Sequence, residues 1–155
     1  MLVNHVVRRE QASILGIEPC RRRNLGSAVT PRLLIDEVVQ ASRHLDDADR
    51  ALVRAVYERG LALKALATVH GTSKGRLHHR LRVIVRRLRS PLFRLVVRER
   101  GVWPAERRFI AETVVLRGKP QRKVAKDLGV SLHRVRTELE HLKALAGVHR
   151  IGGDV

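Results

Sequence analysis

Cysteine and aromatic residues are scarce in this sequence. The single cysteine, Cys20, excludes an internal disulfide, and its neighbours Arg21, Arg22 and Arg23 offer no ligands for a structural metal site. Aromatic residues make up only 3% of the chain, whereas hydrophobic residues reach 44%. A core must therefore be built from Leu, Val, Ala and Ile, a composition that favours helices packed on helices. We predict an all-α fold.

Long apolar runs are also missing. No stretch approaches the roughly 20 consecutive apolar residues that a membrane-spanning helix needs. The first residues include Asn4, His5, Arg8 and Arg9, so they lack the apolar core and cleavage site of a secretory signal. We therefore expect a cytoplasmic protein with no membrane partner.

Carboxylates are absent from one long stretch. Residues 59–98 hold eleven of the 32 Lys and Arg residues and neither an Asp nor a Glu, in a chain whose formal net charge is +17. A surface that serves only solubility usually mixes both signs, so this stretch is expected to face a polyanion. Nucleic acid is favoured over an acidic lipid surface, and a merely solvated basic face is the alternative.

The same stretch has the layout of a helix-turn-helix. Ala67 is small enough for a close helix crossing, Gly71 can end the first helix in the left-handed conformation, and Ser73 can cap the second. Apolar residues then recur at helical spacing and are expected to face inward: Leu77, Leu81, Ile84 and Leu88.

The organisation repeats 58 residues later. When residues 45–90 are aligned without gaps to the sequence 58 positions later, five turn, cap and core residues are identical: Gly60 and Gly118, Ala67 and Ala125, Gly71 and Gly129, Ser73 and Ser131, and Leu81 and Leu139. Because the agreeing positions are turn, cap and core positions, duplication and convergence explain them equally well. The sequence predicts two tandem three-helix units, preceded by a helix that starts at Thr30-Pro31 and ends near His44.

These signals divide the chain as follows. Asp46, Asp47 and Asp49 are expected to open a helix that ends at Gly60, where carboxylates suit the positive end of the helix dipole. The predicted parts are a basic, poorly ordered arm at 1–29, a first helix-turn-helix domain at 30–90, a linker at 91–102 that can hold a short helix, a second helix-turn-helix domain at 103–148 and a tail at 149–155.

Three runs resemble a known family. Gly60–Ala67, Gly71–Arg82 and Val85–Leu88 resemble the promoter-reading fourth region of bacterial sigma factors, in a wingless form shared with LuxR-type domains. In the second copy, Leu128–Arg136 is similar to the same region of primary sigma factors. Sigma factors also melt promoters with an aromatic cluster, but Tyr57, Phe93, Trp103 and Phe109 are scattered here. The resemblance therefore implies a transcription regulator and leaves open whether it acts as a sigma factor.

The resemblance and the residues together select a DNA-binding set. Helix 73–89, and in the second unit helix 131–146, would enter the major groove, where Arg can bond both guanine acceptors. Arg82, Arg86, Arg87 and Arg89 lie farther along the first helix, where phosphate contacts are expected. The predicted DNA-binding residues are Thr72, Ser73, Lys74, Arg76, His78, His79, Arg80, Arg82, Arg86, Arg87, Ser131, His133, Arg134, Arg136 and Thr137.

We predict a non-enzymatic, nucleoid-associated regulator whose second unit binds either DNA or bacterial RNA polymerase. No Ser, Tyr or carboxylate constellation indicates catalysis, and neither a cofactor, a bound metal nor a small-molecule substrate is expected. The adjacent His78 and His79 point to different sides of a helix, and His133 and His141 have no third ligand near them. Two alternatives stay open: an adaptor that binds polymerase or a sigma factor with only non-specific DNA affinity, and the DNA-binding subunit of a recombinase or transposase.

Overall fold

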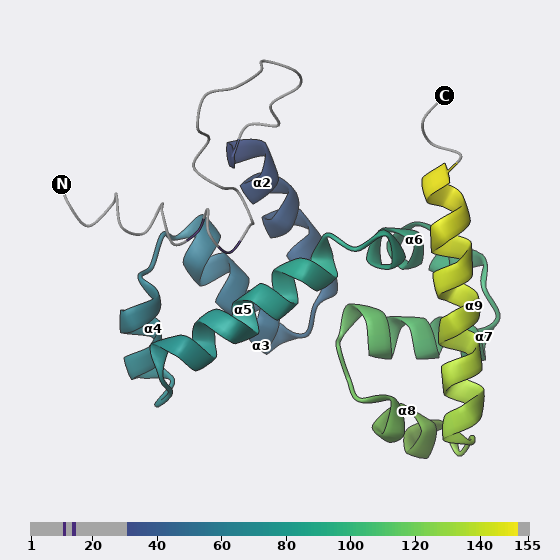
Figure 1. Ribbon diagram of the computed structural model, residues 1–155. Helices are drawn as coiled ribbons and strands as arrows, with labels where there is room; N and C mark the ends of the chain where they lie inside the picture. Colours follow the sequence, from purple (N-terminus) through teal and green to yellow (C-terminus); the bar gives the residue numbers. More distant parts are fainter. Residues whose placement is uncertain (1–10, 12–13, 15–30, 152–155) are drawn as a thin grey trace. The chain divides into compact units, whose positions relative to one another are not determined.

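The described part of the chain is entirely helical in its regular structure. A computed structural model describes Gln11, Ile14 and residues 31–151 (Figure 1). Every regular element in these residues is helical, so the predicted all-α class is confirmed. The chain divides into two compact units. Unit 1 comprises Met1–Arg43 and Asp47–Arg86, and unit 2 comprises His44–Asp46 and Arg87–Val155.

Unit 1 contains the predicted leading helix and a three-helix segment. In order, the elements are α2 (Pro31–Ala41), the 3-10 turn η1 (Ser42–His44), α3 (Asp47–Val53), the π-helical turn η2 (Arg54–Glu58), α4 (Leu63–Val69) and α5 (Lys74–Leu88). The last residue of η1 and the last two of α5 belong to unit 2. The helix α2 packs on η2, and Val38 is buried. All four residues predicted to face inward from α5 are at most 4% exposed, and Val85 joins them.

The turn between α4 and α5 has the predicted chemistry. Gly71 adopts a left-handed φ of 59°, and Thr72 N–H donates to the carbonyl of Ala67 at 2.9 Å, which closes α4. Arg76 N–H then donates to Ser73 Oγ at 3.3 Å, so Ser73 caps α5. The exposed start of α5 is thus fixed by a backbone hydrogen bond before the turn and by a side-chain cap after it.

Unit 2 builds the same local sequence of elements after one extra helix. The elements are α6 (Pro91–Glu99), the 3-10 turn η3 (Arg100–Val102), α7 (Ala105–Ile110), the π-helical turn η4 (Ala111–Leu116), α8 (Gln121–Leu128) and α9 (Leu132–Ile151). The long helix α9 packs against α6, α7 and α8 (Figure 1). Val135, Leu139, Leu142 and Ala146 form its buried side.

The 58-residue repeat holds in the backbone. Each unit has a π turn after its first repeated helix. Arg59 N–H donates to the carbonyl of Arg54 in unit 1, and Arg117 N–H donates to the carbonyl of Glu112 in unit 2, both at 3.0 Å. The glycines that follow, Gly60 and Gly118, have φ values of 65° and 66°. The two units therefore share a local structure as well as turn residues.

The region predicted as a linker, 91–102, contains the short helix α6 that the sequence allowed there. Ser90 accepts a 3.1 Å bond from Phe93 N–H and caps α6, and Pro91 occupies the first turn of that helix. Phe93, Leu95 and Val96 are at most 2% exposed, and α6 packs on α9 and η4. These contacts make α6 part of the core of unit 2.

The predicted ends of the chain also differ where they are described. Gln11 and Ile14, from the predicted arm, are buried, and Gln11 Nε2 donates to the carbonyl of Val56 at 2.5 Å. The rest of the arm at 1–29 and residues 152–155 of the tail lie outside the described residues. The helix α9 continues through Ile151, beyond the predicted end at residue 146. Among the helices of the described part, none is long and apolar enough to cross a membrane.

Candidate nucleic-acid interface

The outward side of α5 is a row of basic residues. Because successive residues of a helix are about 100° apart, burying Leu77, Leu81 and Ile84 places His79 and Arg86 on the opposite side and Arg76 on the flank between the two sides. Of the residues predicted to bind DNA from this helix and the turn before it, Thr72, His78 and Arg87 are half-buried. The exposed ones are Ser73, Lys74, Arg76, His79, Arg80, Arg82 and Arg86.

Three guanidinium groups on this face have no side-chain partner within the described residues. Arg76, Arg82 and Arg86 form no ion pair or side-chain hydrogen bond there. Their donors are therefore available to an external acceptor. Val83, which is 47% exposed, lies among them and provides the one large apolar side chain on this face of α5.

Arg80 is held by a carboxylate. Its Nε and Nη2 atoms donate to one oxygen of Asp49 on α3, at 3.1 and 2.7 Å. The side chain of Asp49 is only 12% exposed, whereas that of Arg80 is 52% exposed. The arginine thus remains on the surface but is oriented and partly neutralised by α3. The predicted helix-start role of Asp49 was incomplete, because this carboxylate also ties α3 to α5.

Arg87 differs from the other predicted phosphate contacts. It belongs to unit 2, where its guanidinium lies against Gly118, two residues after the end of η4. A Cβ at Gly118 would overlap that guanidinium. The half-buried Arg87 therefore packs inside its own unit, and we do not assign it a phosphate.

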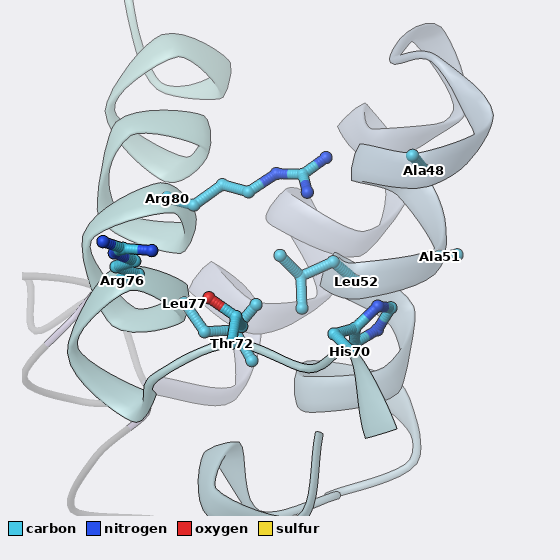
Figure 2. Close-up of a pocket in the computed structure, with 8 residues that line it drawn as sticks. All are labelled: Ala48, Ala51, Leu52, His70, Thr72, Arg76, Leu77 and Arg80. Carbon is cyan, nitrogen blue, oxygen red and sulfur yellow. The ribbon is translucent and has the colours of Figure 1, made fainter. Parts of the chain in front are cut away.

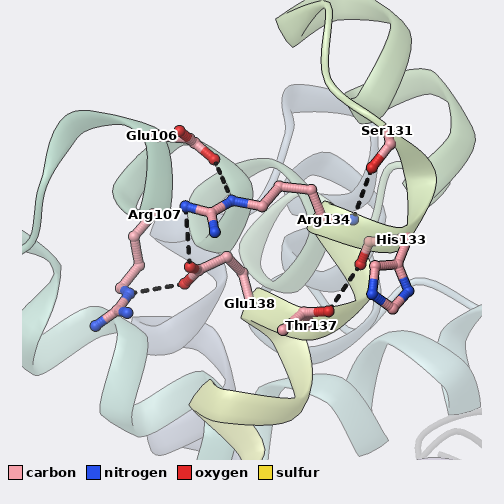
Figure 3. Close-up of polar contacts among 7 residues, drawn as sticks. All are labelled: Glu106, Arg107, Ser131, His133, Arg134, Thr137 and Glu138. Carbon is pink, nitrogen blue, oxygen red and sulfur yellow. Dashed lines mark hydrogen bonds and ion pairs between the residues drawn. The ribbon is translucent and has the colours of Figure 1, made fainter.

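In unit 2 the corresponding helix start is occupied by ion pairs (Figure 3). Arg134 N–H donates to Ser131 Oγ at 3.1 Å, which repeats the cap seen at Ser73. The Arg134 side chain donates to Glu106 at 3.0 Å and lies 3.7 Å from Glu138. The hydrogen bond with Glu106, followed by the charges of both carboxylates, raises the pKa of Arg134. His133, Arg136 and Thr137 are exposed beside it.

The two helices therefore present different charge. At positions 58 residues apart, Arg80 corresponds to Glu138, Arg82 to Glu140 and Arg86 to Ala144, and only Arg76 keeps its charge as Arg134. Glu138 is itself 9% exposed and accepts a 2.8 Å bond from Arg107 on α7. The exposed residues predicted from α5 thus lie on a basic face, whereas the start of α9 lies where Arg134 and Glu138 are held in ion pairs.

Sequence reasoning missed the partners of these arginines. Asp49, Glu106 and Arg107 were not predicted to belong to a site, yet each fixes a charged residue on the helix that carries the cap. The signal was present in the 58-residue alignment. Asp49 falls on Arg107 and Arg80 falls on Glu138, so both charges reverse together.

Comparison of the chain with protein-family models, with curated proteins and with solved structures gives no match. The functional argument therefore depends on the residues themselves and on the difference between two similar units within one chain.

Proposed function

We propose that the protein is a sequence-specific, duplex DNA-binding transcription regulator that reads the major groove with α5. The observation that carries this proposal is the exposed face of α5, where Arg76, Arg82 and Arg86 have no side-chain partner within the described residues. That face lies in the stretch 59–98, which contains no carboxylate. The turn, cap and inward leucines support the helix-turn-helix interpretation, and the resemblance to the fourth region of sigma factors agrees with it.

The residues of this face have distinct proposed roles. Arg76 lies near the start of α5, the end of a recognition helix that approaches base edges, and its guanidinium suits guanine. Arg82 and Arg86 lie one to three turns farther along, where contact with phosphates sets affinity without reading sequence. Arg80 adds a contact whose direction is fixed by Asp49.

We do not extend the proposal to α9. The one arginine that corresponds to Arg76 is bonded to Glu106, and Glu138 and Glu140 replace two further arginines of α5. Carboxylates at these positions would approach phosphates and lower DNA affinity. We therefore propose one DNA-reading unit, unit 1, and note that Arg136 on α9 is exposed and forms no ion pair within the described residues.

A selection of bound sites from random duplexes tests this proposal. We expect the intact protein to enrich one short motif. A variant with Arg76→Ala, Arg82→Ala and Arg86→Ala should lose both the motif and most of its duplex affinity, whereas Arg136→Ala on α9 should keep both. Enrichment of two motifs at a fixed spacing would instead assign reading to both units. Equal binding by the triple variant and the intact protein would contradict the proposal.

A second function is favoured for unit 2 by its exposed apolar residues. Phe109 on α7 is 40% exposed and Val102 is 85% exposed, while the neighbouring α9 lacks the basic face of α5. These features suit contact with protein, as in the adaptor alternative, with bacterial RNA polymerase as the proposed partner. Purified, nucleic-acid-free polymerase should then bind the intact protein and bind the Phe109→Ala variant more weakly. Equal binding of the two proteins would count against this role.

A further inference from the structure

Unit 1 contains a pocket beside the start of α5. It has a volume of about 320 Å³ and lies between α3, the turn after α4 and α5 (Figure 2). Its apolar wall comes from Leu52 and Leu77, each 4% exposed, and from the small side chains of Ala48 and Ala51. A pocket of this size is at the lower limit of those that hold small organic molecules, so it suits a ligand with one or two rings.

The rim of the pocket is basic. Arg76 and Arg80 line it from α5, and the imidazole of His70 and the hydroxyl of Thr72 line it from the turn. Figure 2 shows Arg80 reaching across from α5 toward α3. Because Asp49 already neutralises part of Arg80, the two arginines and this carboxylate together carry one net positive charge. This balance matches a single carboxylate better than a dianion.

The equivalent positions of unit 2 carry larger side chains. Ala48 corresponds to Glu106 and Ala51 to Phe109, so a carboxylate and an aromatic ring replace two methyl groups. In unit 2 the residue that corresponds to Arg76 donates to that carboxylate. Unit 1 thus lacks an acidic group that the same local structure holds elsewhere, and an external carboxylate can supply it.

We propose that this pocket binds a small aromatic or aliphatic monocarboxylic acid. Its apolar body lies against Leu52, Leu77 and Ala51, and its carboxylate accepts hydrogen bonds from Arg76 and from the Arg80 donors that Asp49 leaves unused. A guanidinium has five donors and Arg80 uses two of them on Asp49, so orientation by α3 and ligand binding are compatible.

A consequence for DNA binding follows, and it rests on the proposed function. The donors of Arg76 cannot serve a bound carboxylate and a base edge at once. The acid would therefore compete with specific DNA while leaving phosphate contacts by Arg82 and Arg86 in place. Such a ligand would lower sequence-specific binding more than binding to an unrelated duplex.

The test uses the full chain without DNA. The protein is titrated by calorimetry with 2-naphthoate and indole-3-acetate, and with the uncharged 2-naphthamide as a control. At least one of the two acids should bind at least tenfold more tightly than the amide. Ala51→Phe, which places the side chain of unit 2 in the pocket, should weaken acid binding at least tenfold, and Arg76→Ala should do the same. Phe109→Ala, the reciprocal change in unit 2, should leave it unchanged. Equal affinity for acid and amide, or undiminished binding by Ala51→Phe, would overturn the proposal.

A separate measurement addresses the coupling. Duplex binding is measured with and without saturating 2-naphthoate, in the intact protein and in Ala51→Phe. If 2-naphthoate weakens duplex binding by the intact protein but not by Ala51→Phe, the coupling is supported. If the acid binds the intact protein and duplex binding does not change, the coupling is refuted. If the intact protein binds no duplex, the proposed function fails while the calorimetric result on the pocket stands.

Discussion

Arg107 donates a 2.8 Å hydrogen bond to Glu138, and this pair repeats, with both charges exchanged, the bond between Asp49 and Arg80 found 58 residues earlier. In both pairs the carboxylate is the more buried partner, with a side-chain exposure of 11% or 12%. The link between the first and third repeated helices is thus kept while the charge offered by the third helix is reversed. Stability and surface charge can therefore be changed separately.

Exchanging the charges of the unit 1 pair should separate folding from DNA binding. Arg80→Glu alone places two carboxylates together and should lower the free energy of unfolding by about 1–3 kcal/mol, because a buried charge loses its partner. Adding Asp49→Arg recreates the arrangement of unit 2 and should recover most of that loss. The double variant should still bind duplex DNA more weakly than the intact protein. Urea unfolding and duplex titration measure the two effects, and recovery of DNA affinity together with stability would argue against a groove-facing Arg80.

Removing the carboxylate that bonds Arg134 should give α9 a DNA contact that the intact protein does not make. Glu106→Ala leaves the cation of Arg134 less neutralised, so duplex affinity should rise. The slope of log K against log salt concentration should steepen by about 0.9 for the added phosphate contact. The matched change in unit 1, Ala48→Glu, should pair with Arg76 and lower specific binding. Titrations at several salt concentrations check both variants, and an unchanged slope for Glu106→Ala would show that loss of this carboxylate does not bring α9 to DNA.

Two glycines with the same backbone conformation should respond differently to alanine. Gly60 and Gly118 both have φ near 65°, where an L side chain costs about 1–2 kcal/mol. A Cβ at Gly60 meets no atom within 4 Å, whereas one at Gly118 overlaps the Arg87 guanidinium. Gly118→Ala should therefore destabilise its unit more than Gly60→Ala does, and adding Arg87→Ala should remove part of the excess. Trp103, the only tryptophan, reports unfolding of unit 2, and Tyr57, the only tyrosine, reports unit 1. Equal losses would mean that the guanidinium moves aside freely.

Alkaline pH should weaken unit 1 through Tyr57. Burial raises the pKa of this phenol above its ordinary value near 10. Above pH 10 the folded state therefore keeps a proton that the unfolded state releases. The contribution of Tyr57 to the free energy of unfolding is intact below pH 10 and is lost as pH rises above it, by at most about 1.4 kcal/mol per pH unit. Tyrosinate absorbance should appear well above pH 10 and coincide with unfolding. Tyr57→Phe should reduce this part of the pH dependence, and ionisation near pH 10 in a fully folded protein would contradict the prediction.

Much of the fold could be predicted from local patterns. Leucines at helical spacing, Gly71 before a capping Ser73 and the 58-residue offset indicated the helices, the turn and the inward face of α5, because each depends on neighbours in sequence. The role of α6 could not be read in this way. Its run Leu92–Arg98 fits helix or strand, and only contact with α9 decides that it forms core instead of a linker.

The candidate site was harder to predict than the helices. Exposed arginines on α5 follow from periodicity, but their partners lie 31 residues earlier, as for Asp49 with Arg80. Charge along one helix says nothing about such a contact. For this reason Arg80 and Arg134 were expected to be as available as Arg76, whereas the folded chain holds both against carboxylates.

The π turns described in both units also have a consequence for rebuilding the chain. A π turn holds one residue more than the α-helix around it, so deleting that residue would rewind the helix and rotate everything after it by about 100°. Because η2 and η4 carry this extra residue at matching places, Arg54–Leu88 and Glu112–Ala146 are segments of equal length that can be exchanged without an insertion or a deletion. Chimeras joined inside these turns would keep each inward face aligned, whereas junctions that drop one residue would turn leucines toward water.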